Sequence, residues 1–218
     1  MSKFHGVESV KTDNAKVSAK HLLRNSVLAQ FDETSCLDVF CGAGKMWKSV
    51  WHKCDNYTGI DIRAFFDSRH TICGDALAVI NNIDISGYNI FDIDAYGSPY
   101  DVLDLILSKT IDSQKIAFCI TDGSAMDMRM GRVSKGMRLV SGISRHKIKK
   151  IHLIQDEVIE KIIKTTAAKL CGKVVDFHIA TGVTGSAMRY YTFIVERNSE
   201  RLSIDCDNRP VDISANLS

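Results

Sequence analysis

The sequence of 218 residues lacks the features that mark membrane-spanning, secreted or fibrous chains. It has only two prolines, Pro99 and Pro210, and no apolar run near the roughly 20 residues that a membrane helix requires. Its N-terminus lacks the apolar stretch of a secretory signal. With 45% hydrophobic and 25% charged residues and a net charge of +2, the composition excludes a mainly disordered chain. We therefore expect a globular, cytoplasmic protein without membrane association.

The seven cysteines include no CxxC pair, and the seven histidines show no metal-ligand spacing, so no metal site is expected. Four of the cysteines lie in apolar, strand-like segments. They are Cys36, Cys41, Cys73 and Cys119. This placement predicts small buried thiols in a reducing compartment rather than disulfides.

Apolar, β-branched segments alternate with amphipathic ones along the chain. Strands are predicted near 36–41, 57–62, 71–74, 89–94, 115–121, 173–180 and 189–196. Helices are predicted near 13–30, 44–54, 76–83, 99–109 and 152–170. This alternation indicates an α/β fold with a doubly wound, mostly parallel sheet. We expect one domain over 1–198, with a basic insertion at about 124–150 and a polar extension over 199–218.

Two helix boundaries have recognisable signals. Ser98 and Pro99 are typical of an N-cap and a first helical position. The helix near 152–170 carries an apolar stripe and is expected to end at Gly172. The stripe consists of Ile154, Val158, Ile159, Ile162, Ile163, Ala167 and Leu170.

A glycine-containing turn follows the first predicted strand, in the segment Asp38-Val39-Phe40-Cys41-Gly42-Ala43-Gly44. A P-loop is disfavoured because valine stands at its first glycine and Met46 at its magnesium-binding position. A dinucleotide fingerprint requires a third glycine that is absent. A nucleoside-binding turn needs only GxG with an early acid, which Asp38 supplies. A strand–helix turn that binds no ligand remains the alternative.

Two further acids follow the next predicted strands. Asp61, followed by Ile62, comes about 20 residues after the glycines, the spacing at which a carboxylate reaches a ribose diol. Asp75, followed by Ala76, ends the third strand and is a candidate acceptor for an adenine amino group. Either acid could instead cap a helix. The series favours a nucleoside with a charged side arm, and S-adenosylmethionine fits it better than NAD.

The fourth strand end, DIDAYGSP over 92–99, is the most informative segment. Together with DVFCGAG, GIDI and GDA it resembles class I S-adenosylmethionine-dependent methyltransferases. Taken alone, it resembles the DxDPFGSP signature of the tRNA guanine-N2 dimethyltransferase family. The resemblance implies a seven-stranded Rossmann-like sheet whose last strand is antiparallel, with S-adenosylmethionine as the cofactor. The residues expected to bind it are Asp38, Phe40, Gly42, Gly44, Asp61, Ile62, Asp75, Ala76 and Asp92.

The chain departs from that family in two ways. Ala95 stands where the signature has proline, and the family's C-terminal RNA-binding domain does not fit within 218 residues. The backbone carbonyl at position 95 is kept, and the lost rigidity costs about 0.4–1 kcal/mol. A protein partner that supplies substrate binding is therefore one expectation.

The chemistry of the fourth strand end can be derived from its residue types. An exocyclic base amine is a poor nucleophile because its lone pair delocalises into the ring. A carboxylate from Asp94 and the carbonyl of Ala95 can accept its two N–H bonds and direct the lone pair at a methyl group. Tyr96 can stack on the base, a contact worth roughly 1–3 kcal/mol. These three residues are the predicted catalytic group.

Residues 124–150 concentrate positive charge. They carry eight basic side chains and one acid, a net +7 against −5 for the rest of the chain. The segment follows the fifth strand and so leaves the same sheet edge as Asp94, which favours a phosphate-binding surface. The residues expected to contact phosphate are Arg129, Arg132, Lys135, Arg138, Arg145 and Lys147.

The sequence therefore predicts an N-methyltransferase for an exocyclic amine of a nucleic-acid base. Guanine N2 in RNA is the first candidate, and RNA is favoured over DNA. Adenine N6 in DNA or RNA comes next, and small-molecule amines remain possible acceptors. Two other classes stay open: a non-catalytic subunit with this fold, and an enzyme that cleaves S-adenosylmethionine without methyl transfer.

Overall fold

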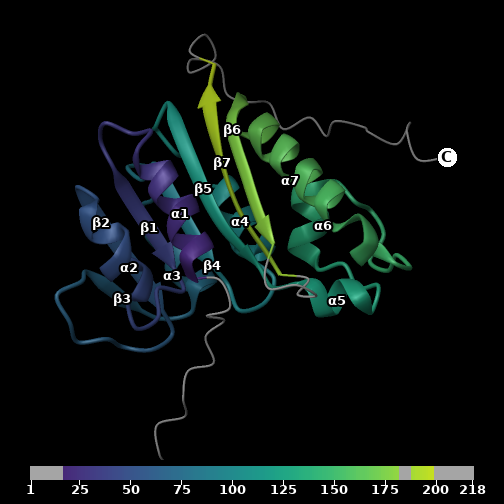
Figure 1. Ribbon diagram of the computed structural model, residues 1–218, viewed down its shortest axis with the longest axis horizontal. Coiled ribbons are helices and arrows are strands. Elements are labelled where there is room, and N and C mark those ends of the chain that lie inside the picture. Colours follow the sequence, from purple (N-terminus) through teal and green to yellow (C-terminus); the bar gives the residue numbers. More distant parts are fainter. Residues whose placement is uncertain (1–16, 182–187, 199–218) are drawn as a thin grey trace, which may run out of the picture.

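The computed structural model describes residues 17–181 and 188–198 (Figure 1). Within them, seven strands form one sheet in the order β3-β2-β1-β4-β5-β7-β6. The strands are β1 (Ser35–Val39), β2 (Asn56–Asp61), β3 (Thr71–Cys73), β4 (Ile90–Asp94), β5 (Lys115–Asp122), β6 (Gly172–Thr181) and β7 (Arg189–Arg197). All seven predicted strands are confirmed.

Strand directions follow the predicted arrangement. The neighbours β3-β2-β1-β4-β5 pair in parallel, whereas β7 pairs antiparallel with both β5 and β6. The carboxyl ends of the parallel strands therefore share one edge of the sheet, which is the edge where α/β folds bind ligands.

Helices cover both faces of the sheet (Figure 1). They are α1 (Val17–Leu28), α2 (Lys45–Ser49), α3 (Ala76–Asn82), α4 (Tyr100–Leu107), α5 (Ala125–Arg129), α6 (Lys135–Ser141) and α7 (Gln155–Lys169), with the 3-10 turns η1 (Trp51–Lys53) and η2 (Ile151–Ile154). Side chains of α1, α2 and η1 pack in one core cluster, and those of α3, α4, α6 and α7 in another. The predicted helices are confirmed except near 44–54, where Val50 separates the short helix α2 from the 3-10 turn η1. Residues 13–16 lie outside the described part of the chain, as does the predicted extension 199–218.

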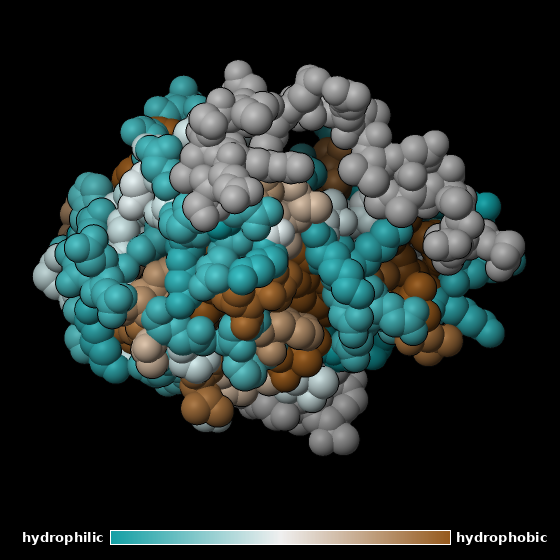
Figure 2. All heavy atoms as spheres, turned by 90° about the horizontal axis from the view of Figure 1, so that it is seen from above, coloured by the Kyte–Doolittle hydropathy of each residue, from teal (hydrophilic) through white to brown (hydrophobic). Residues whose placement is uncertain are grey.

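The two clusters follow from strand periodicity. In β5, Phe118 and Ile120 belong to the α4 side, whereas Ala117 and Cys119 belong to the α1 side. Successive side chains of a strand point to opposite faces, so a strand covered on both sides must be apolar at consecutive positions. Figure 2 shows one face of the molecule, on which apolar residues gather near the centre and hydrophilic residues surround them.

Some boundary predictions need correction. Helix α7 ends before Cys171, which takes the left-handed conformation (φ 52°), and Gly172 instead begins β6. A Cβ at Gly172 would lie 2.4 Å from the Glu196 carbonyl oxygen, so close strand pairing explains this glycine. Of the predicted stripe, Ile154 lies in η2 and is exposed.

The start of α4 also differs from the prediction, which had Ser98 as the N-cap and Pro99 as the first helical position. Pro99 takes the N-cap position, and no side-chain hydrogen bond caps the helix. The Ser98 hydroxyl instead lies 3.3 Å from that of Ser134, at the start of α6. Ser98 therefore joins two neighbouring helices rather than starting one.

Among the four cysteines expected to be buried thiols, Cys36, Cys41 and Cys119 are buried and free. Cys73 is free but exposed, because β3 is the short outer strand of the sheet. In the described residues, no helix is long and apolar enough to cross a membrane. The same residues hold no cluster of His, Cys, Asp or Glu suited to a metal ion.

Candidate active site at the carboxyl edge of the sheet

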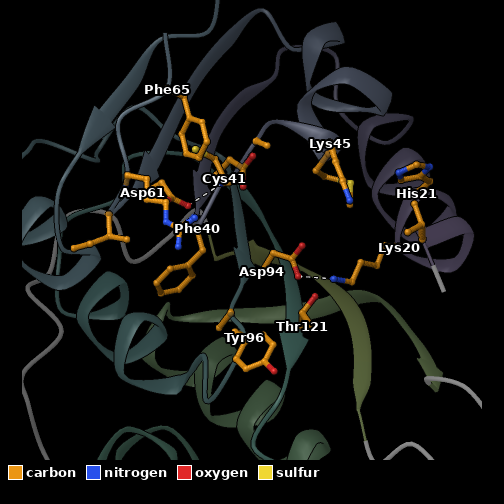
Figure 3. A pocket seen from close by; sticks show the side chains of 18 of the residues that line it. Lys20, His21, Phe40, Cys41, Lys45, Asp61, Phe65, Asp94, Tyr96 and Thr121 are labelled. Carbon is orange, nitrogen blue, oxygen red and sulfur yellow. Dashed lines mark hydrogen bonds and ion pairs between the residues drawn. The ribbon is translucent and has the colours of Figure 1, made fainter. Parts of the chain in front are cut away.

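A cavity of about 410 Å³ opens at the carboxyl edge of the sheet (Figure 3). Its size falls in the range of small-molecule sites. The turn after β1, the ends of β2 and β4, and one face of α1 contribute to its lining. The predicted site residues that line it are Asp38, Phe40, Gly42, Asp61, Ile62, Asp94, Ala95 and Tyr96. Both predicted groups, cofactor-binding and catalytic, therefore meet in one cavity.

Four predicted cofactor residues lie outside the cavity lining. They are Gly44, Asp75, Ala76 and Asp92. Asp75 accepts a hydrogen bond from the Ala78 amide (3.0 Å) and caps α3, and Ala76 is buried in the core. For Asp75 the helix-capping alternative is thus the observed one.

Gly44 serves the turn through Arg69. It has a φ of 73°, and a Cβ there would lie 2.7 Å from the guanidinium carbon of Arg69. The same guanidinium donates to the Gly42 carbonyl oxygen (3.0 Å) and pairs with Asp67 (2.8 Å). The left-handed φ therefore favours glycine at 44, and the Arg69 side chain packs close to it and braces the turn from outside the cavity.

Asp61 ties the glycine turn to β2. One of its carboxylate oxygens accepts from the Gly42 amide (2.9 Å), and the other accepts from the Arg63 amide (3.0 Å). Phe40, at the start of the turn, has a φ of 71°, which is rare for a residue with a side chain. The turn is held in a single shape that leaves Phe40 and Ile62 on the cavity wall beside a carboxylate.

Asp38 lies deeper, at the base of the cavity. It is buried and accepts a hydrogen bond from the Tyr57 hydroxyl (2.9 Å). Burial, and then the neighbouring Asp92 carboxylate, raise the pKa of Asp38. A cationic group that enters the cavity would relieve both effects.

Asp92 is fully buried in a charged network beneath the cavity. The Arg24 guanidinium contacts its two carboxylate oxygens at 2.6 and 2.7 Å, and the Trp51 indole nitrogen donates to one of them at 2.7 Å. Its predicted contact with the cofactor is therefore corrected: Asp92 joins α1 and η1 to the sheet.

Asp94, two residues further along β4, reaches the cavity. Its Oδ1 accepts from Lys20 Nζ at 2.7 Å, and its side chain is 25% exposed (Figure 3). Burial raises the pKa of Asp94, but Arg24 and Lys20 outweigh it, so the pKa lies below its ordinary value. Asp94 is therefore a carboxylate at neutral pH. Ala95 is buried next to it, and Tyr96 is 71% exposed at the cavity rim.

Gly123 supports the loop that carries Tyr96. Its amide donates to the Gly97 carbonyl oxygen (3.0 Å), and a Cβ there would lie 2.4 Å from the Tyr96 carbonyl oxygen. In the Gly123→Ala variant the added methyl group would force this loop to shift. We therefore expect the variant to lower catalytic turnover by about tenfold or more, while ligand binding at the glycine turn persists. Steady-state kinetics and calorimetry would measure the two effects.

Gly97→Ala is the matched control, because nothing lies within 4 Å of a Cβ at Gly97. It should leave turnover close to that of the unchanged protein. Equal losses in the Gly97 and Gly123 variants would contradict a supporting role for Gly123.

Sequence reasoning missed the side chains that face the aspartates from other elements. They are Lys20, Arg24, Trp51 and Thr121, and the sequence likewise held no sign of Arg69, which braces the glycine turn. The one signal available was the i, i+4 spacing of Lys20 and Arg24 on a helix, which places two cations on one face. That face proves to be the buried one.

The basic segment folds into α5, α6 and the following loop. Of the six predicted phosphate contacts, all except Arg138 are exposed. Arg132 pairs with Asp127 at 3.2 Å, and both side chains are more than half exposed. The segment begins at the end of β5, the strand next to β4, so it lies beside the edge that holds Asp94.

Comparison with known proteins identifies similar folds. No protein-family model and no curated protein sequence matches the chain. Among solved structures, the N-methyltransferase NodS from Bradyrhizobium japonicum WM9 in complex with S-adenosyl-L-homocysteine is similar at 12% identity (TM-score 0.52; 85% of this chain, 90% of that chain). Trm1 from Pyrococcus horikoshii in complex with S-adenosyl-L-methionine is similar at 12% identity (TM-score 0.61; 88% of this chain, 57% of that chain). The chain therefore has the fold of the S-adenosylmethionine-dependent methyltransferases.

Proposed function

We propose that the protein is an S-adenosylmethionine-dependent N-methyltransferase acting on an exocyclic amine of a nucleic-acid base. Guanine N2 in RNA is the first candidate acceptor, and adenine N6 is the second. One observation carries the proposal. The glycine turn at Gly42, the Asp61 carboxylate that it contacts, and the segment Asp94-Ala95-Tyr96 all line the same cavity. A nucleoside-binding half and an amine-binding half would thus lie within reach of each other.

The cofactor half suits a nucleoside with a charged arm. The Asp61 carboxylate lines the cavity together with the apolar side chains of Phe40 and Ile62, which matches a ribose beside a flat base. Burial raises the pKa of Asp38, and a cationic amino group that enters the cavity would lower it again and pair with the resulting carboxylate. S-adenosylmethionine, when bound, supplies a methyl group on a positively charged sulfur.

The acceptor half can prepare an amine. During transfer the nitrogen would gain the methyl carbon as the carbon–sulfur bond breaks, with the bonding electrons staying on sulfur in neutral S-adenosylhomocysteine. Positive charge would develop on the nitrogen until it loses one proton. The Asp94 carboxylate stabilises this charge and is the nearest acceptor for the proton, and the Ala95 carbonyl accepts the second N–H. Tyr96, exposed at the rim, is placed to stack on the base. Alignment of these groups supplies most of the rate gain.

The basic segment supports a nucleic-acid substrate. Exposed cations such as Arg145 and Lys147 belong to a net +7 segment beside the active edge. A protein partner that adds RNA contacts is compatible with this arrangement. Phosphate contacts are expected to make catalysis depend steeply on salt, unlike transfer to a small amine.

The test is incubation with methyl-labelled S-adenosylmethionine and separate pools of tRNA, rRNA and DNA. Label in a nucleoside that digestion identifies as N2-methylguanosine or N6-methyladenosine supports the proposal and selects the base. Cofactor binding without any transfer would indicate a non-catalytic subunit. Release of methylthioadenosine without an acceptor would indicate a cleaving enzyme.

Charge reversal in the basic segment should weaken substrate binding. We expect Arg145→Glu with Lys147→Glu to raise KM for the nucleic acid about tenfold or more at moderate salt. The slope of log KM against log salt should fall by about 0.7–0.9 per lost phosphate contact. Lys53→Glu with Lys164→Glu, outside the segment, gives the same charge change as a control. Equal effects of the two pairs would contradict a specific phosphate surface.

A further inference from the structure

Two charged pairs join α1 to the carboxyl end of β4. Lys20 and Arg24 are four residues apart on the helix, and Asp92 and Asp94 are two apart on the strand. Four helical residues rise about 6 Å and two strand residues about 6.6 Å, so the pairs match in spacing. The Lys20–Asp94 and Arg24–Asp92 contacts are 2.7 and 2.6 Å.

The two pairs differ in what surrounds them. Arg24 and Asp92 are 1% and 0% exposed, and the Trp51 indole adds another donor. The Lys20 side chain is 8% exposed but lines the cavity together with Asp94 (Figure 3). The first pair is internal to the protein, whereas the second forms part of the cavity wall.

We propose that Lys20 is a positioning residue for Asp94: its ammonium group fixes Oδ1, so that the carboxylate presents Oδ2 to the acceptor amine. This inference rests on the proposed function. Lys20 is itself held in place, because its ammonium lies 5.1 Å from the centre of the Tyr190 ring on β7. Helix α1 thereby becomes part of the transfer site.

Several charged and polar groups around Asp94 change the pKa of its carboxyl group, and Lys20 acts among them. Those that act on its charge are Lys20 and Arg24 from α1, Asp92 from β4, Asp38 from β1 and Thr121 from β5. Thr121 is the register partner of Asp94, and its buried hydroxyl also helps to lower the pKa of the Asp94 carboxyl. Arg24 donates its hydrogen bonds to both carboxylate oxygens of Asp92, and Lys20 is the cation that donates to Asp94.

The test compares Lys20→Met, Lys20→Gln and Lys20→Arg in the full chain. Loss of the ammonium should raise the pKa of Asp94 by about 1 unit or more. The acid limb of kcat should move up in pH by the same amount, with KM for S-adenosylmethionine nearly unchanged. Lys20→Arg should restore both. The carboxyl carbon of labelled aspartate, followed by NMR against pH, reports the shift without any turnover.

Lys53→Met is the matched control, since Lys53 also contacts α1, through Asn25 (3.0 Å), but on its exposed side. An unchanged Asp94 titration in both neutral Lys20 variants would overturn the inference. Absence of transfer by the unchanged protein to every acceptor would instead overturn the proposed function, and the NMR titration would still decide the role of Lys20. If Lys20→Met does not fold, Lys20→Gln carries the comparison.

Discussion

Replacement of Asp94 with alanine is expected to lower methyl transfer by about 10²–10⁴-fold, the usual range for loss of a group that handles a proton in the transition state. Asp94 places a carboxylate in the cavity, and Arg24 and Lys20, which outweigh the effect of burial, keep its pKa low. Without it, the amine keeps one acceptor, the Ala95 carbonyl, and the developing positive charge has no counter-ion. Single-turnover transfer of labelled methyl groups would measure the change.

The same variant should still bind S-adenosylmethionine, because Asp61 and Gly42 lie on other strands and turns. Calorimetry would confirm that binding persists. Asp112→Asn, at an exposed aspartate outside the cavity lining, is a control for loss of one carboxylate charge. Full activity in Asp94→Ala would reject the amine-binding role of Asp94.

Replacement of Arg24 with methionine is expected to have the largest effect on stability. Arg24 and Asp92 are almost fully buried, and removal of one partner leaves the other charge uncompensated. Such losses typically cost about 3–5 kcal/mol in the free energy of unfolding. For a chain of this length that corresponds to a fall in Tm of about 10 °C. Chemical denaturation and thermal scans would give the two values.

The loss should also depend on pH in a defined direction. Burial raises the pKa of Asp92, and removal of Arg24 takes away the cation that opposes this effect. A carboxyl group whose pKa is raised in the folded state binds its proton more tightly there than in the unfolded chain. Stability of the variant relative to the unchanged protein should therefore decline as pH rises above the ordinary aspartate pKa.

A double variant separates charge burial from lost packing. Arg24→Met combined with Asp92→Asn removes both charges and should recover most of the stability, with the Trp51 donor still able to bond the amide oxygen. A double variant no more stable than Arg24→Met alone would show that packing of the Arg24 side chain, and not its charge, is what matters.

The strands and most helices could be predicted from the sequence because local patterns encode them. Consecutive apolar residues such as those of β5 are needed wherever a strand is covered on both faces, so the pattern itself indicates a parallel sheet. The position of Asp94 was predictable for the same reason: parallel strands deliver their carboxyl ends to one edge. The end of α7 and the start of α4 were harder to predict, because Gly172 and Ser98 are fixed by contacts with segments that are distant in the sequence.

Similar sequence signals had different outcomes at Asp61 and Asp75. Both acids follow strands, yet Asp61 lines the cavity and Asp75 caps α3. The sheet order makes the difference, because β2 lies next to the central β1 and β3 is the outer strand. No local pattern specifies that order.

The α/β alternation, the acidic strand ends and the basic segment can be predicted from the sequence, because each depends on neighbouring residues along the chain. Which acids share a cavity, and which partners they contact, depends on how distant segments pack together. Lys20 and Asp94 are 74 positions apart, and Arg24 and Asp92 are 68 apart. Their contacts exist because α1 packs on the sheet. The free energy of that packing comes from many contacts across the interface, so neither segment alone shows which residues will meet.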